Sequence, residues 1–324
     1  MGDLPALEHS DLRWPPSQLD KDRAGESSTS SDSAPFYRYL APTSRMSDSQ
    51  ALRKLLKSNL TIPTMPAIVQ KISALIRDPK TGTREIGSLV AEDAPLAAKV
   101  LRIANSAYYG LAHECLSTEH ASTILGLNVL KNIVTQVSVI TQFENLEKET
   151  GFDVSKIWRR SSLTAQIAER MAPLCKKVRV LSPDEFYVCG LLHKVGQVVM
   201  LDSIGKPYAQ LLQVASHNPS CTQLLETKKL GFNHQEVGAL VAKRWDLPEA
   251  VVDAIQFHGQ PLEALGPRLH VHLITVASQA AKRLMDGDSE GATAVLLHAA
   301  DALGMDTQAA AGLIDKVNLE DELA

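Results

Sequence analysis

The sequence predicts an all-α fold, and three observations support this prediction. Apolar residues recur with a helical period of about 3.6 residues over most of the chain after Ser47, as in the stripe formed by Ile68, Ile72, Leu75 and Ile76. Helix-start signals precede several of these stripes. Alternating apolar and polar segments joined by hairpin turns, which indicate β-strands, are absent.

Each predicted helix is placed by its apolar stripe and, in several cases, by a start signal. Pro66 and Pro95 open the first two helices, because proline is tolerated in the first helical turn. The strongest start lies at Ser182, which precedes a proline and has Glu185 at the capping-box position. In chain order the stripes are Ile68–Ile76, Leu96–Ala104, Val129–Phe143, Phe186–His193, Val237–Trp245, Pro248–Phe257, His270–Leu284 and Ala292–Leu303.

Composition divides the 324-residue chain into three parts. Residues 1–47 are rich in serine and proline and too poor in apolar residues to offset the entropy of ordering, so we predict a disordered tail. Residues 48–150 are predicted to form a first helical lobe and residues 151–324 a second, separated at the polar stretch Lys148–Asp153. The C-terminal helices are expected to pack on the second lobe through an apolar face that contains Leu273, Ile274, Val276 and Leu284.

Charge and cysteine content exclude several classes of protein. The chain carries 33 Lys and Arg against 37 Asp and Glu, a net charge of −4, whereas domains that bind nucleic acid through their overall charge are strongly basic. Two small basic spots, Lys176–Arg179 and Lys228–Lys229, are typical of solvated faces. There is no secretory signal and no run of about 18 apolar residues, so we expect a cytoplasmic protein. The cysteines form no CxxC pair, which argues against a disulfide scaffold or a zinc ribbon; they are Cys115, Cys175, Cys189 and Cys221.

Three of the ten histidines stand where a site could form. His193, His234 and His258 lie on or at the ends of predicted helices, and helical bundles build metal sites from inward-facing His and carboxylate residues. Lys194, however, follows His193 where a hydrolytic site requires a carboxylate. Two unit charges about 4 Å apart interact by about 4 kcal/mol at an effective dielectric constant of about 20, so exchanging −1 for +1 opposes metal binding strongly. Each histidine is therefore interpreted as a core residue that is hydrogen-bonded to backbone or carboxylate.

A series of motifs runs through the chain in a fixed order. Those of the first half are Leu60–Pro66, Leu101–Gly110 and Ile124–Leu127, of which Ala-Asn-Ser-Ala-Tyr-Tyr-Gly is the most specific. Those of the second half are Gly190–Gly196, His234–Ala239, Lys243–Pro248 and Phe257–His258. In this order, from Leu60 to Pro261, they resemble the HDOD (HD-related output domain) family.

The resemblance implies a two-lobed, all-α bacterial domain that is associated with signalling and is related to the HD phosphohydrolases. In the catalytic relatives an early helix supplies a His, a His-Asp pair follows, and a later helix supplies an Asp. The matching positions here are Arg160, His193 with Lys194, and Ser278. Most of the metal ligands are therefore replaced, and no Gly-Tyr-Pro element stands near His258. The resemblance thus predicts no catalytic residue, no metal and no cofactor.

Five polar residues of the second lobe have two interpretations: Arg160, His193, Lys194, His234 and His258. In the favoured one they are relics, with the cations pointing to solvent over their aliphatic stems and the histidines satisfied locally. In the other they converge on the former metal cleft and bind an anion, such as a nucleotide phosphate or an acidic partner side chain. Arginine supplies a planar fork and lysine a point charge for such a group.

The most specific motif also has two interpretations; its polar, aromatic and glycine residues are Asn105, Ser106, Tyr108, Tyr109 and Gly110. It is either a helix-ending corner that packs two tyrosines between the lobes or an interaction surface. Asn and Ser end helices by bonding nearby backbone groups, and glycine tolerates positive φ. Packing is favoured for the tyrosines, because aromatic residues at helical spacing are usually in the core.

Three classes of function remain open. The favoured one is a non-catalytic bacterial signal-transduction module that acts through protein–protein contacts, with a nucleotide or other anionic ligand as an option for the cleft. The alternative is a divergent phosphohydrolase or phosphodiesterase that acts on nucleotides. A nucleic-acid-associated regulator is disfavoured by the acidic charge balance.

Overall fold

Helices form all the regular structure in the described part of the chain. The computed structural model describes residues 60, 62–78, 80–106, 109–216, 222–259 and 268–317. The predicted all-α fold is confirmed over these residues, and the predicted tail, 1–47, lies outside them. Within the described ranges, we find no helix with the length and apolar character that a bilayer span requires.

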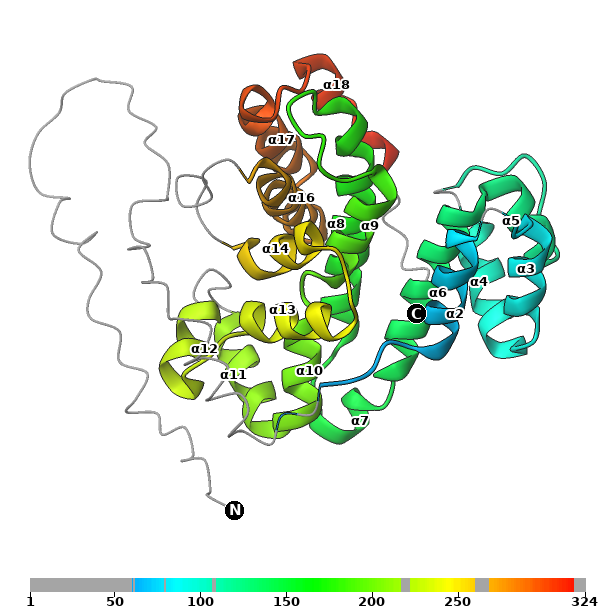
Figure 1. The fold of residues 1–324 in the computed structure, drawn as a ribbon. Helices are drawn as coiled ribbons and strands as arrows, with labels where there is room; N and C mark the ends of the chain where they lie inside the picture. The colour runs from blue at the N-terminus through cyan, green and yellow to red at the C-terminus, as the bar shows by residue number, and fades with distance from the viewer. Residues whose placement is uncertain are drawn as a thin grey trace, which may run out of the picture. The chain divides into compact units, whose positions relative to one another are not determined.

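Figure 1 shows the helices in their order along the chain. Those of the first lobe are α2 (Ala67–Arg77), α3 (Thr83–Ala91), α4 (Ala94–Ala104), α5 (Thr118–Leu125) and α6 (Leu127–Gln142). The following elements are α7 (Leu146–Thr150), α8 (Ser155–Met171), η3 (Ala172–Leu174), α9 (Pro183–Leu192), α10 (Val195–Ile204), α11 (Lys206–Ser216) and α12 (Thr222–Leu230). The chain continues with α13 (His234–Arg244), α14 (Glu249–Phe257), α16 (Leu269–Met285), α17 (Ser289–Leu303), α18 (Thr307–Ala311) and η5 (Ile314–Lys316).

Two capping boxes start helices that carry or support the site. The predicted box at Ser182 is confirmed: its backbone N–H donates to Glu185 Oε2 (2.8 Å), and its hydroxyl accepts from the Glu185 N–H (3.3 Å). A second box, which sequence reasoning did not single out, lies at Asn233, whose Oδ1 accepts from the N–H groups of Gln235 and Glu236. Such caps stabilise a helix by about 0.5–2 kcal/mol. The second box sets the start of α13, and with it the position of His234.

Buried apolar residues form two clusters. The first runs from Val69 to Val137 and the second from Val139 to Val317, so the change from one to the other falls within α6. Gly151 ends α7 with a φ of +71°, close to the predicted lobe boundary. The division at 148–153 stays a prediction, because Phe143 and Leu146, which precede it, already belong to the second cluster.

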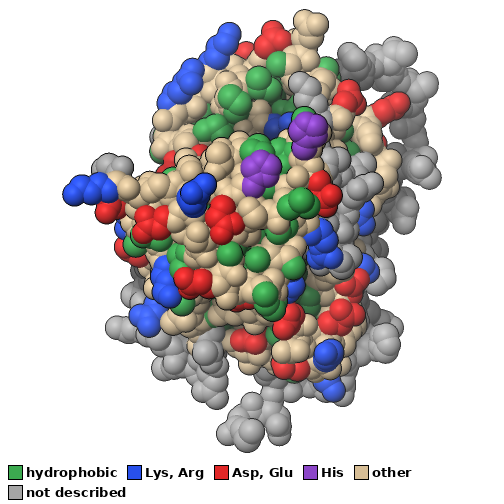
Figure 2. All heavy atoms as spheres, turned by 90° about the vertical axis from the view of Figure 1, so that its right-hand side faces the viewer, with side chains coloured by type: hydrophobic (Ala, Val, Ile, Leu, Met, Phe, Trp, Pro, Cys, Tyr) green, Lys and Arg blue, Asp and Glu red, His purple; other side chains and the backbone are tan. Residues whose placement is uncertain are grey.

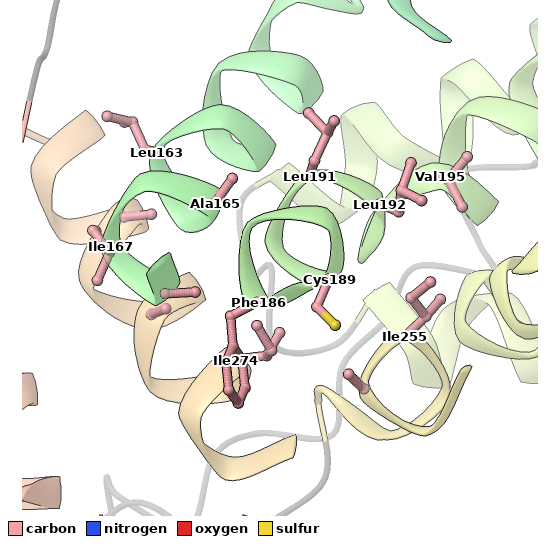
Figure 3. Packing of buried hydrophobic residues seen from close by; sticks show 14 of the residues in the cluster. Leu163, Ala165, Ile167, Phe186, Cys189, Leu191, Leu192, Val195, Ile255 and Ile274 are labelled. Carbon is pink, nitrogen blue, oxygen red and sulfur yellow. The ribbon is translucent and has the colours of Figure 1, made fainter. Parts of the chain in front are cut away.

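The second cluster is built around α8, α9, α16 and α17, whose packing is visible in Figure 1. Phe186 and Cys189 lie on the side of α9 that faces Ile274 of α16 and Ile255 of α14 (Figure 3). Gly190 allows α9 to approach α8 closely, since a Cβ there would lie 2.5 Å from the Ala165 Cα. The predicted apolar face of the C-terminal helices is confirmed, because all four of its residues are buried in this cluster: Leu273, Ile274, Val276 and Leu284.

Surface charge is mixed on the face of the molecule drawn in Figure 2, where basic and acidic side chains alternate among scattered hydrophobic ones. This distribution gives that face no extended positive field of the kind that attracts nucleic acid. Cys115, Cys175 and Cys189 are buried free thiols, as expected, whereas Cys221 lies outside the described residues.

Candidate functional site

The five polar residues predicted for the second lobe come together, four of them from helix ends and Arg160 from within α8. Arg160 lies on α8, His193 caps the C-terminal end of α9, and Lys194 is the N-cap residue of α10. His234 is the first residue of α13, and His258 caps the C-terminal end of α14. These helices pack against one another (Figure 1), and their side chains are joined by the contacts described next.

Ser278 of α16 connects Arg160 to His193. Arg160 Nη2 donates to the Ser278 Oγ (3.1 Å) and to its carbonyl oxygen (3.2 Å). His193 places Nδ1 2.6 Å from the Gly190 carbonyl and Nε2 3.0 Å from the Ser278 Oγ. A carbonyl only accepts, so the His193 proton is on Nδ1, and Nε2 accepts from the Ser278 hydroxyl. The neutral imidazole is therefore fully satisfied by local partners.

Glu226 of α12 organises the other half of the site. Its Oε2 accepts from the His234 backbone N–H (2.9 Å) and from His234 Nδ1 (2.6 Å), and its Oε1 accepts from the Tyr208 hydroxyl (2.6 Å). His234 consequently carries its proton on Nδ1 and presents the lone pair of Nε2. Lys194 Nζ donates to that lone pair at 3.2 Å. The result is a chain of hydrogen bonds from a carboxylate through an imidazole to an amine.

His258 closes the cluster. Its ring meets that of His193 edge to face, with centroids 4.9 Å apart, and lies 5.6 Å from the ring of His234. Nδ1 is 2.7 Å from the Ile255 carbonyl, whereas Nε2 is buried and has no hydrogen-bond partner in the described part of the chain. The Arg160 Nε is a second buried nitrogen without such a partner.

Burial sets the protonation of these groups. It lowers the pKa of His193 and of His258 well below the usual range, and the neighbouring charge of Lys194 adds to the effect. Burial also lowers the pKa of His234, against the opposing effect of Glu226. Burial and the charge of Arg160 lower the pKa of Lys194 to about 7, and burial lowers that of Arg160 to about 10. At neutral pH the histidines are uncharged, Arg160 is charged, and Lys194 is charged in about half of the molecules.

The buried histidines should make the fold sensitive to acid. A His whose folded-state pKa is lowered binds its proton first in the unfolded chain, so stability is lost as the pH falls below about 6.5. Each such histidine contributes up to about 1.4 kcal/mol per pH unit. We expect the free energy of unfolding, measured by urea titration, to fall steeply from pH 6.5 to 5.5. The His258→Gln variant should show a shallower fall, and a flat profile for the wild type would contradict this account.

A pocket of about 230 Å³ opens onto the site. Arg160 and Lys194 line it, as do two further lysines that have carboxylate neighbours: Lys282 is 2.9 Å from Asp286, and Lys156 is 3.6 Å from Asp153. Its apolar wall includes Phe152, Ile157, Leu212, Ala215 and Met285. Within the described ranges, neither Arg160 nor Lys194 forms an ion pair with a carboxylate. The pocket therefore combines an apolar wall with two basic side chains that form no ion pair. Asp286 also lines it, and its negative charge acts on Arg160 from a longer distance.

Comparison with known proteins identifies the family. The family model described as HDOD domain matches residues 62–261, which is more than half of the chain. The chain belongs to the HDOD domain family. The match covers the first buried cluster, the second cluster as far as Ile255, and the helices that carry the five predicted polar residues, whereas α16 with Ser278 lies beyond it.

Relatives of this HDOD chain agree with the fold. A protein of Treponema pallidum named "Uncharacterized protein" is 27% identical over 197 residues. The aligned part is 61% of this chain and 37% of that protein, so the chain spans well under half the length of this curated relative. An "HDOD domain protein with unknown function" from Geobacter sulfurreducens superposes with a TM-score of 0.62 at 24% identity, covering 83% of this chain and 97% of the other. A "Putative phosphohydrolase" from Shewanella amazonensis superposes with a TM-score of 0.66 at 22% identity, and the alignment covers 84% of this chain and 97% of the other. At these identities the two structures establish a shared fold.

The donor set of this HDOD domain does not fit a divalent metal. The lone pair that His234 presents is occupied by the Lys194 ammonium, and that of His193 by the Ser278 hydroxyl. The Lys194 amine contacts His234, and the Arg160 guanidinium shares Ser278 with His193, so positive charge adjoins both imidazoles and would repel a divalent ion there. No group of three His, Cys, Asp or Glu side chains within the described ranges is arranged to hold an ion.

The specific motif of the first lobe lies in the other cluster. Asn105 ends α4, and its side chain holds the Cys115 backbone with two hydrogen bonds, Oδ1 to N (2.7 Å) and Nδ2 to O (2.9 Å). Gly110 has a φ of +57°, which the sequence interpretation anticipated. Tyr109 packs on the first lobe's own core and not between the lobes, because Asn105 folds the following loop back onto α4. Ser106 Oγ is buried without a partner in the described ranges, and Tyr108 lies outside them.

Two supporting residues were not found by sequence reasoning. Glu226 and Tyr208 are fully buried beneath His234, yet nothing in the neighbouring sequence of either residue distinguishes it from an ordinary helix position. Ser278 was identified only as a replaced position, whereas it bridges Arg160 and His193. The two predicted cations do not extend freely into solvent, since Arg160 and Lys194 are half-buried and hydrogen-bonded within the cluster.

Proposed function

We propose that this HDOD chain is a non-catalytic bacterial signalling module that acts through protein contacts and whose cleft binds an anionic ligand. One observation supports the anionic ligand: Arg160 and Lys194 line the same pocket, both are half-buried, and neither forms an ion pair with a carboxylate in the described ranges, although Asp286 also lines the pocket. An unpaired charge withdrawn from water costs several kcal/mol, and an anion between the two cations would offset that cost. The family membership supports the regulatory role.

The available nitrogens suit a phosphate or carboxylate. The buried Arg160 Nε donor has no partner in the described ranges. Lys194 has three possible donor positions, of which His234 engages one. Hydrogen bonds to charged groups contribute about 1.5–3 kcal/mol each, which corresponds to a roughly 10- to 100-fold change in affinity.

Isothermal titration calorimetry with inorganic phosphate and with a nucleoside monophosphate tests this proposal. We expect Arg160→Ala and Lys194→Ala each to weaken binding at least tenfold. Binding of an anion favours the charged amine, so Lys194, with a pKa of about 7, should take up a fraction of a proton at pH 7.5. That uptake appears as a dependence of the observed heat on the ionisation enthalpy of the buffer.

Lys228→Ala is the matched control, because this exposed lysine lies on α12 outside the pocket lining and should leave the affinity unchanged. Absence of heat with both anions would overturn the ligand part of the proposal. Turnover of a phosphodiester with Mn²⁺ or Mg²⁺ that His193→Ala abolishes would overturn the non-catalytic part and favour the divergent phosphohydrolase.

A further inference from the structure

The Glu226–His234–Lys194 chain has the arrangement of an activated nucleophile. In such arrangements a base within hydrogen-bond reach of the nucleophile is itself oriented by a third group. Here the base is His234 Nε2, 3.2 Å from Lys194 Nζ, and the orienting group is Glu226, 2.6 Å from His234 Nδ1. The Tyr208 hydroxyl donates to the second carboxylate oxygen of Glu226, so this series of hydrogen-bonded side chains is held in place. Simple burial of a relic lysine does not require this order of partners.

The surroundings of Lys194 shift its protonation from the ammonium toward the neutral amine. Arg160 and the uncharged His193, His234 and His258 face it from α8, α9, α13 and α14, and the buried carboxylate of Glu226 is used by other donors. The pKa of about 7 leaves roughly half of the amine neutral at pH 7. An ordinary lysine with a pKa of about 10.4 is neutral in only about one molecule in 2,500 at that pH.

The pocket supplies access and a place for an anionic group. Lys194 and Arg160 line the same 230 Å³ space, and the Arg160 Nε donor is free of protein partners in the described part of the chain. An anion on Arg160 would place the remainder of a small ligand beside Lys194. The volume suits a compound of a few heavy atoms more readily than a large cofactor.

We propose that Lys194 captures a small carbonyl compound that carries a carboxylate or phosphate, as an imine, with Arg160 holding the anionic group. This inference rests on the proposed function, of which it specifies the ligand class. The neutral Nζ adds to the carbonyl carbon, and the C=O π pair moves to oxygen. His234 Nε2 takes one proton from Nζ and passes it to this oxygen, which becomes a hydroxyl group. The C–O bond then breaks, and the hydroxyl leaves as water with the second proton of the nitrogen. A C=N bond between Nζ and the former carbonyl carbon remains. No oxidant or reductant takes part.

Reductive trapping of the full chain tests the proposal. The protein is incubated at pH 7 with glyoxylate, an anionic aldehyde, and sodium cyanoborohydride, and modified peptides are located by mass spectrometry. We expect Lys194 to be modified at least tenfold faster than any other lysine. Acetaldehyde, which has no anionic group, should modify it at least tenfold more slowly than glyoxylate does.

Variants separate the possible outcomes. Arg160→Ala should slow trapping by glyoxylate more than trapping by acetaldehyde, because it removes the group that holds the anion and also raises the pKa of Lys194, which slows both reactions. Lys228→Arg should change neither. Lys194→Arg keeps the charge and cannot form an imine, so it should bind phosphate in calorimetry without giving an adduct. If the wild type binds phosphate but glyoxylate modifies Lys194 no faster than the other lysines, the imine is wrong and the anion site stands. If Lys194 is trapped equally by both aldehydes and phosphate gives no heat, the anionic class and the proposed function are both wrong.

Discussion

Replacing Glu226 with alanine is expected to destabilise the fold by about 3–5 kcal/mol, because buried donors that lose their acceptor cost about 1–3 kcal/mol each. The carboxylate is fully buried and accepts from the Tyr208 hydroxyl, the His234 ring and the His234 backbone. Burial opposes its ionisation, but the charge and hydrogen bonds of these partners outweigh this effect and lower its pKa. Alanine would leave three donors without an acceptor. Urea unfolding at pH 7.5 measures the loss.

Two variants control the Glu226 experiment. Glu226→Gln keeps the volume and one oxygen acceptor, so we expect a smaller loss, of about 1–3 kcal/mol. Glu147→Ala removes an exposed glutamate and should change stability by no more than about 0.5 kcal/mol. A Glu226→Ala variant as stable as the wild type would show that the Glu226–His234 contact does not hold the cleft together.

The second large effect is expected at Gly196, where α10 crosses α13. A Cβ at this position would lie 1.8 Å from the His234 carbonyl oxygen and 2.7 Å from the Gly238 nitrogen. Both are backbone atoms, so the helices must separate to admit even one methyl group. Overpacking of this kind costs about 1–3 kcal/mol and sometimes more. We expect Gly196→Ala to lose at least about 3 kcal/mol in urea unfolding.

The same substitution should also affect binding. His234 begins α13, so moving that helix moves the partner of Lys194. We expect weaker phosphate binding in calorimetry by folded Gly196→Ala protein. Gly82→Ala is the matched control, because nothing lies within 4 Å of a Cβ there and its φ of −82° is ordinary; its stability should change by less than about 1 kcal/mol. Equal stability of the two variants would contradict the close helix crossing.

Local signals predicted the helices that carry a clear apolar stripe or a start signal, and the reason is physical. The sequence analysis did not single out α3, α5, α8, α10, α11 and α12. The stripe Ile68–Ile76 and the capping box at Ser182 act within one or two turns, so they can be read without knowing what packs on them. The box at Asn233 uses the same chemistry and has the same spacing of three residues to its glutamate, Glu236. No local sequence signal shows where the first buried cluster ends and the second begins, because this change falls inside α6, which is a single uninterrupted helix.

The candidate site could be predicted from the sequence only in part, because it depends on contacts between residues that are far apart in the chain. Residue identities alone indicated that a lysine replaces an acidic group beside His193, and this disfavours a metal whatever the packing. Whether Arg160 and Lys194 reach solvent or turn inward depended on helices far away in the chain. Arg160 meets Ser278 across 118 positions, and His193 meets it across 85. Periodicity orients a side chain about its own helix axis, whereas the angle and spacing between helices come from packing of the whole core. Glu226 beneath His234 is the clearest case, since its role exists only because α12 and α13 meet.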